Sequence, residues 1–264
     1  MPFAQCGDNQ VYYEDTGGDG HPVVLAHGYG MDHSMFVGQA ALAGRWRVIT
    51  WDARSHGKTT DQGRPFTYWD LARDLLSLMD ALRIPRATIG GVSQGGFISL
   101  RAALLAPDRV HSLLLFDTEA GACSPEDRVA YGQMFDALTE RGPVRELVHP
   151  LAAQIIGDHP AAADWEGRWA ADGVPLGAAR ACLLGRDDII DRLTEIQCPA
   201  LLVRGEHDAS IPAERMTILE EQLANATSIH VIAGAGHSPP LTHPEQANAV
   251  IAGFLSAHTD SAAA

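Results

Sequence analysis

The sequence predicts an α/β fold, in which helices cover both faces of a mostly parallel β-sheet. Short apolar runs rich in β-branched residues alternate with amphipathic stretches along the chain, the order expected of strands and helices that follow one another in turn. Several runs are apolar throughout, as strands buried on both faces of a parallel sheet are. The early runs end in polar loops that contain glycine, which marks where the strands stop.

Composition limits the class of protein. The 264 residues are 46% hydrophobic and 20% charged, which suits one large domain or one domain with a modest insertion. A small disulfide scaffold, a disordered chain and a collagen-like chain are excluded. The 33 acidic and 19 basic residues give a formal charge of −14, which repels phosphate backbones and anionic lipids. We therefore expect neither a nucleic acid nor a membrane as partner.

The ends and the cysteines of the chain carry no targeting or metal signal. Residues 1–8 form neither a cationic nor an apolar segment, and no stretch of about 18 apolar residues follows. We expect a soluble, cytoplasmic chain. No two cysteines are close enough in sequence to suggest a metal site or a redox motif. Reduced structural thiols and no metal are expected; the cysteines are Cys6, Cys123, Cys182 and Cys198.

The first half of the chain alternates strand and helix. Residues 3–6 and 11–16 are expected to form two strands joined by a turn, and the apolar runs at 23–26 and 48–51 are the next two. Leucines and a methionine then recur at steps of three and four, which predicts a helix over 67–83. A strand at 87–92 and a helix at 94–106 follow, and Pro107 ends that helix.

The second half contains a long segment without strand signals. Buried strands are expected at 112–116, 199–203 and 227–232, with closing helices at 213–224 and 244–258. Between residues 121 and 197 only helical patterns remain, which predicts a helical insertion. Its helices are expected at 125–140, 143–156, 161–171 and 175–196, the last with a break near Gly185.

A serine sits in a glycine-flanked turn between a predicted strand and a predicted helix. In the segment Gly91-Val92-Ser93-Gln94-Gly95, the glycines allow a sharp bend that lifts the Ser93 hydroxyl out of the sheet. The N-terminus of the helix then places the Gln94 amide where an anion could form on a substrate carbonyl. This pattern is typical of a serine nucleophile.

A serine hydroxyl needs a base, and the base needs an acid that orients it. His237 follows the last predicted strand in a loop of small residues, and Asp208 follows the strand before it. The chain order Ser, Asp, His is the one expected for such a turn. Asp117, at the end of the neighbouring strand, is an alternative acid, with Glu206 and Glu119 as weaker candidates.

The loop after the strand at 23–26 offers the second donor for an oxyanion. We expect the backbone amide of Tyr29 to provide it, together with that of Gln94. His27, in the same loop, is expected to tie loops together by hydrogen bonds, because the sequence places no companion ligands for a metal near it.

These motifs together resemble the α/β-hydrolase superfamily over nearly the whole chain. They are the loops at 27–28 and 52–57, the turn at 91–95 and the segments at 205–208 and 236–237. The resemblance implies an eight-stranded, mostly parallel sheet and a cofactor-free Ser-His-Asp hydrolase. It also implies a core at 1–120 and 191–264 with a helical cap at 121–190. One departure is Ser55, where the family usually has glycine.

The resemblance is closest to carboxylesterases and 3-oxoadipate enol-lactonases. It implies hydrolysis of a small-molecule ester or lactone through an acyl-enzyme. Two alternatives stay open: cofactor-free haloperoxidase, perhydrolase or carbon–carbon hydrolase chemistry on the same triad, and a non-catalytic small-molecule receptor. The sequence gives no indication of oligomeric state.

The insertion is expected to set substrate specificity. Five of its apolar side chains can line a pocket or pack the insertion on the sheet: Tyr131, Met134, Phe135, Trp165 and Trp169. A dicarboxylate lactone would require an arginine facing Ser93, and the candidates are Arg128, Arg145, Arg168 and Arg180. A mainly apolar ester or lactone is the expected substrate.

Overall fold

The computed structural model describes residues 2–259 and contains one eight-stranded sheet with the order β1-β2-β4-β3-β5-β6-β7-β8. The strands from β4 onward along this order pair in parallel, whereas β1 and β2 pair antiparallel at one edge. The α/β fold class is therefore confirmed. The strands are β1 (Phe3–Cys6), β2 (Asn9–Asp15), β3 (His21–Ala26), β4 (Trp46–Trp51), β5 (Ala87–Val92), β6 (Val110–Phe116), β7 (Ala200–Gly205) and β8 (His230–Ile232).

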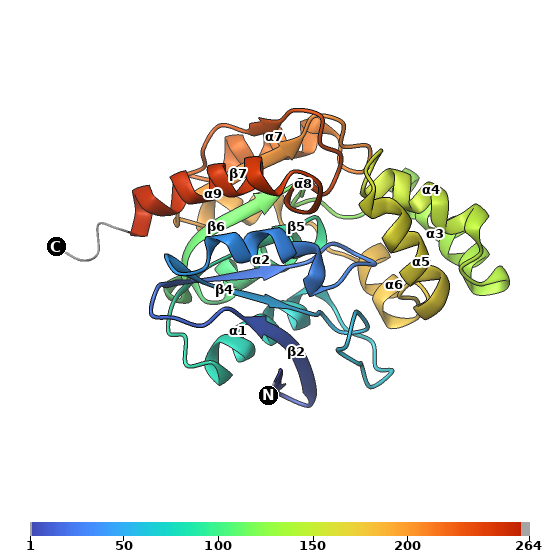
Figure 1. Cartoon of the computed structure of the whole chain (residues 1–264), viewed down its shortest axis with the longest axis horizontal. Helices are drawn as coiled ribbons and strands as arrows, with labels where there is room; N and C mark the ends of the chain where they lie inside the picture. The colour runs from blue at the N-terminus through green and yellow to red at the C-terminus, as the bar shows by residue number, and fades with distance from the viewer. Residues whose placement is uncertain (1, 260–264) are drawn as a thin grey trace.

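Helices lie on both faces of this sheet. Figure 1 shows η1 and α9 on one face, with α1 and α2 on the other. Strand β5 is buried at every residue, as a strand covered on both faces must be. Within residues 2–259, the helices are all too short or too polar to cross a membrane. Those of the core are η1 (His33–Leu42), α1 (Tyr68–Ala81), α2 (Gln94–Leu105), η2 (Pro107–Arg109), α7 (Ala213–Gln222), α8 (Pro239–Thr242) and α9 (Pro244–Thr259).

The segment between β6 and β7 is helical, as expected. Figure 1 shows α3 to α6 gathered at one end of the sheet, apart from both chain termini. The segment contains none of the eight strands of the sheet. Its elements are α3 (Pro125–Arg141), α4 (Arg145–Ile155), α5 (Ala161–Asp172), α6 (Ala178–Leu184) and η3 (Ile190–Glu195).

Two local features differ from the expectation. The last strand is short, because Thr227 pairs with Ala200 and the Ile229 N–H turns away to the Glu220 carboxylate. Helix η1 has no apolar periodicity by which the sequence could reveal it; the Asp32 side chain starts it by accepting from the Ser34 N–H. Residues 1 and 260–264, which the sequence assigns to the core, lie outside the described residues.

Candidate active site

Ser93 occupies a strained turn between β5 and α2. Its φ of 53° and ψ of −112° lie outside the regions that L-residues favour. The turn is possible because β3 passes close by: a Cβ atom on Gly91 or on Gly95 would overlap the carbonyl oxygen of Ala26. Both glycines are therefore required by packing, and the bend they allow is the one that the sequence predicts.

The backbone of Ser93 is held on both sides. Its N–H donates to the Phe116 carbonyl at 2.9 Å, and its carbonyl accepts from the Thr118 hydroxyl at 2.7 Å. Both partners lie at the end of β6. These two bonds fix the turn without using the Ser93 hydroxyl, which makes no hydrogen bond to the described residues and stands in a pocket.

His237 and Asp208 form a buried pair. The Nδ1 atom of His237 lies 2.9 Å from Oδ1 of Asp208, and both side chains are at most 5% exposed. The loops that carry these two residues lie in close contact at Gly205 and Gly236. A Cβ atom on Gly205 would overlap the Gly236 carbonyl oxygen, so only glycine permits this contact. Of the four candidate acids, Asp208 is the one hydrogen-bonded to the imidazole among the described residues.

The Asp208 carboxylate is held as an anion. Its Oδ1 also accepts from the N–H groups of Ser210 at 2.8 Å and Ile211 at 3.2 Å. Burial raises the pKa of this carboxyl, but the charge and hydrogen bond of His237 outweigh burial and lower the pKa to about 2. A carboxylate in this state fixes the ring orientation of His237 and stabilises its protonated form.

Asp117 lies behind this pair. Its Oδ1 accepts from the Gly205 N–H at 2.9 Å, and its side chain is fully buried. Burial and the neighbouring Asp208 carboxylate raise its pKa well above the usual value. No hydrogen bond joins Asp117 to His237 in the described part of the chain.

Ser93 and His237 line one pocket. No hydrogen bond joins the Ser93 hydroxyl to the His237 ring within residues 2–259; in ligand-free enzymes such bonds are often long. Half of the lining residues come from the segment between β6 and β7, and most of the lining is apolar. The further lining residues are Gly28, Tyr29, Val92, Phe97, Glu119, Tyr131, Met134, Phe135, Leu151, Gln154, Ile155, Leu183, Arg186, Ser210, Ile211 and Ser238.

The five apolar side chains expected at the pocket divide into two groups. Tyr131, Met134 and Phe135 line it, whereas Trp165 and Trp169 do not. The indole N–H of Trp169 donates to the Gly30 carbonyl at 2.6 Å. Of the two alternatives, pocket lining is therefore corrected for both tryptophans, and Trp169 packs α5 against the loop that follows β3.

Two backbone N–H groups beside Ser93 are unused. Within the described residues, neither the Tyr29 nor the Gln94 N–H donates a hydrogen bond. The ideal Cβ position on Gly28 lies 3.9 Å from the Ser93 Cβ, so this loop passes directly beside the serine. Such a pair of free donors is what an oxyanion requires.

His27 joins two loops, as expected. Its Nε2 accepts from the Ala53 N–H at 3.0 Å, and its Nδ1 lies 2.8 Å from the Gly28 carbonyl. Burial lowers its pKa, so the ring is neutral. These contacts hold the loop that carries Tyr29 against the loop after β4.

The sequence did not reveal a buried ion pair in the pocket lining. Arg186 binds the carboxylate of Glu119, donates to the Gly121 carbonyl at 2.9 Å, and stacks 4.7 Å from the Phe97 ring centroid. The one available signal was the position of Glu119, two residues beyond Asp117 at the same strand end.

None of the four arginines proposed to face Ser93 lines this pocket. Arg168 lies 3.4 Å from the Asp32 carboxylate and Arg180 lies 2.6 Å from that of Asp136. Arg128 and Arg145 are likewise outside the lining. The arginine that does reach the pocket, Arg186, is already paired.

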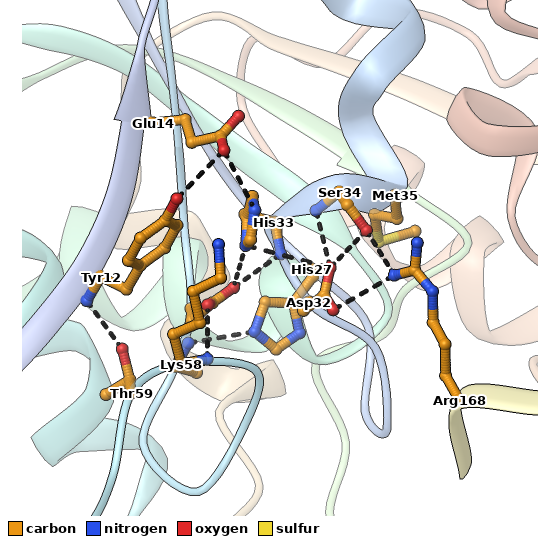
Figure 2. A network of polar contacts seen from close by, with 12 residues as sticks. Tyr12, Glu14, His27, Asp32, His33, Ser34, Met35, Lys58, Thr59 and Arg168 are labelled. Atoms are coloured by element: carbon orange, nitrogen blue, oxygen red, sulfur yellow. Dashed lines mark hydrogen bonds and ion pairs between the residues drawn. The ribbon is translucent and has the colours of Figure 1, made fainter. Parts of the chain in front are cut away.

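A second polar cluster lies beside η1 and contains another histidine–aspartate pair (Figure 2). Nδ1 of His33 lies 2.8 Å from Oδ1 of Asp52, and its Nε2 lies 3.3 Å from the Glu14 carboxylate. Asp52 also accepts from the N–H groups of His33 and Lys58. Asp32 is near enough to complete a three-ligand set for a metal with His33 and Asp52. The carboxylate oxygens and ring nitrogens that would bind the metal are, however, already paired with protein groups.

The chain is similar to proteins of known class along most of its length. Residues 23–250 match the family described as "Alpha/beta hydrolase family". A protein of Caulobacter sp. assigned as carbamate hydrolase RutD is 32% identical, with 93% of this chain and 96% of that protein covered.

Solved structures give the same picture. A thermophilic esterase from Thermogutta terrifontis has a TM-score of 0.86 and 28% identity, covering 97% of this chain and 98% of that one. The enol-lactonase from Burkholderia xenovorans has a TM-score of 0.87 and 26% identity, covering 97% and 100%.

Proposed function

Because the chain belongs to the alpha/beta hydrolase family, we propose that it cleaves a carboxylic ester or lactone through an acyl-enzyme on Ser93. The observation that carries the proposal is the shared pocket of Ser93 and His237, with Asp208 bound to the far side of the His237 ring. A nucleophile, a base and an orienting acid are thereby assembled in one place. The proposed reaction requires no cofactor.

The proposed reaction runs in two steps. In the first, His237 takes the Ser93 proton through Nε2, the Ser93 oxygen attacks the carbonyl carbon, and the carbonyl oxygen accepts from the N–H groups of Tyr29 and Gln94. Collapse expels the alcohol oxygen, which takes the proton from His237. In the second, His237 activates water in the same way, the acid is released, and Ser93 regains its proton. Each oxyanion donor is expected to contribute about 3 to 4 kcal/mol.

The proposed substrate carries an uncharged, mainly apolar acyl or alkyl group. Tyr131, Met134 and Phe135 supply apolar walls, and we propose that residues 121–190 act as the cap that closes over it. Among the described lining residues the one arginine or lysine is Arg186, which pairs with Glu119; Arg215 also pairs with Glu119 and in addition with Asp127. A substrate carboxylate would gain little there and would lose its hydration.

The relatives support acyl transfer to water as the common chemistry. They are named as a carbamate hydrolase, an esterase and an enol-lactonase. In each case the bond cleaved is that of a carbonyl group to oxygen or nitrogen. We propose the ester or lactone bond for this chain because its pocket is apolar, and p-nitrophenyl esters, a lactone panel and a peracid assay test this choice.

The proposed nucleophile is tested with Ser93→Ala and a remote serine control. Ser93→Ala is expected to abolish ester hydrolysis and labelling by a fluorophosphonate, because it removes the attacking oxygen. Ser256→Ala on α9, whose hydroxyl only bonds the Ala252 carbonyl, should leave both unchanged. Circular dichroism checks the fold. Ester turnover by purified Ser93→Ala at the wild-type rate would overturn the proposal.

A further inference from the structure

Two neighbouring buried aspartates each have one carboxylate oxygen that makes no hydrogen bond to the described residues. Oδ2 of Asp117 and Oδ2 of Asp208 are both buried without a hydrogen-bond partner. Ligand atoms of these two residues and of His237 lie within 4.8 Å of one another. Buried polar atoms are almost always paired, and two ionised carboxylates side by side repel each other. A single proton between the two oxygens would satisfy both.

We propose that Asp117 is a positioning residue: it keeps a proton on Oδ2 and donates it as a hydrogen bond to Oδ2 of Asp208. The inference rests on the proposed function, in which Asp208 orients His237. Asp117 touches neither substrate nor the imidazole. It acts through Asp208 alone.

The other carboxylate oxygens of the two residues already have hydrogen-bond partners. Oδ1 of Asp208 is occupied by His237, Ser210 and Ile211, so only Oδ2 is free. Oδ1 of Asp117 accepts from the Gly205 N–H, so Oδ2 is the oxygen left to carry the proton. One chain of hydrogen bonds then runs from β7 through both acids to the imidazole.

The surroundings favour the protonated form of Asp117. The residue is 0% exposed, and the charged groups around it are Asp208, His237 and Arg204. The Nη atoms of Arg204 donate to the carbonyls of Gly205 and Asp208, and its buried Nε has no hydrogen-bond partner among the described residues. Burial and the Asp208 charge therefore both raise the pKa of Asp117.

The inference predicts an alkaline limit on activity. When Asp117 loses its proton, Asp208 loses a donor and gains a repelling neighbour, so His237 is no longer held. Asparagine at this position can form the same two bonds, with its carbonyl accepting from Gly205 and its amide donating to Asp208, and it does not titrate. Leucine has a similar size and can form neither bond.

The test compares Asp117→Asn with Asp117→Leu across pH 6 to 10 on a p-nitrophenyl ester. Asp117→Asn is expected to keep kcat within about threefold at neutral pH and to lack the alkaline limb, whereas Asp117→Leu loses about 10- to 100-fold in kcat with little change in KM. Equal loss in both variants, or an alkaline limb that persists in Asp117→Asn, would overturn the inference.

A second readout does not depend on turnover. The proton on Asp117 predicts a carboxylic acid C=O band in the infrared spectrum of the wild type at neutral pH, which Asp117→Asn removes and the exposed-site variant Glu195→Gln keeps. Absence of the band in the wild type would overturn the inference even if Asp117→Leu does not fold. Failure of the proposed function shows separately, as turnover that survives Ser93→Ala.

Discussion

The described residues include two buried histidine–aspartate pairs that have nearly the same hydrogen-bond distance but different surroundings. In one, Nδ1 of His237 lies 2.9 Å from Asp208; in the other, Nδ1 of His33 lies 2.8 Å from Asp52. They differ at the second ring nitrogen. Nε2 of His33 lies 3.3 Å from Glu14, whereas Nε2 of His237 has no hydrogen-bond partner among residues 2–259 and its side chain lines the pocket of Ser93.

The difference explains why we propose His237, and not His33, as the base. His33 sits among three carboxylates; burial lowers its pKa, but the hydrogen bond to Asp52 and these charges outweigh burial and raise it. Its ring therefore has a structural role: it joins β2, η1 and the loop after β4 (Figure 2). A bonded acid alone does not make a base; the opposite nitrogen has to be free beside a nucleophile.

The largest expected effect separates the two aspartates by activity. Asp208→Asn is expected to lower kcat by about 10⁴-fold with the fold intact, because an amide favours the wrong tautomer of the imidazole. The matched change Asp52→Asn is expected to leave kcat of the folded protein within a few-fold of wild type. Steady-state hydrolysis of a p-nitrophenyl ester measures both. Equal losses in the two variants would erase the distinction drawn between the pairs.

The next effect separates them by stability. Asp52→Ala is expected to lower the free energy of unfolding by about 3 to 5 kcal/mol, because it leaves the N–H groups of His33 and Lys58 and the His33 ring without their buried acceptor. Urea unfolding measures it. Glu195→Ala, which breaks an exposed pair with Arg192, serves as the control and should stay close to wild type.

The smallest effect is the pH dependence of stability at His33. A pKa raised in the folded state means that this group stabilises the fold fully below its unfolded pKa of about 6.5 and loses that contribution as pH rises through the folded pKa. Wild type minus His33→Asn should therefore show a larger stability difference at about pH 5.5 than at about pH 8.5. The exposed His207→Asn provides the baseline. A stability difference that grows with pH would contradict this structural role of His33.

The parts of the site that sequence could predict are those fixed by local backbone geometry. Gly91 and Gly95 are needed because β3 passes against them, and such a constraint leaves a fixed spacing around Ser93. The polar residues after β5, β7 and β8 follow the ends of strands, and parallel strands bring those ends to one edge. The turn at Ser93 and the loop at His237 could therefore be located from residue order.

The lining of the pocket could not be predicted in the same way. Which side of α5 faces the core depends on packing with distant segments, so the sequence left open whether Trp165 and Trp169 line the pocket or pack the insertion. In the structure neither lines the pocket, and Trp169 contacts the loop after β3. Arg186 reaches the pocket only because Glu119, 67 positions earlier in the chain, binds it. Choosing between Asp208 and Asp117 also required coordinates, since both follow strands of the same edge.

Helix α4 is hydrogen-bonded to the two loops that carry the proposed base, His237, and its acid, Asp208. The Ser238 hydroxyl, one residue after His237, donates to the Ile155 carbonyl at 2.8 Å, and the Ser210 hydroxyl, two residues after Asp208, donates to the Gln154 carbonyl at 3.4 Å. An outward movement of α4 large enough to admit a substrate would have to break both hydrogen bonds. These two hydrogen bonds therefore link the position of α4 to the loops that carry His237 and Asp208.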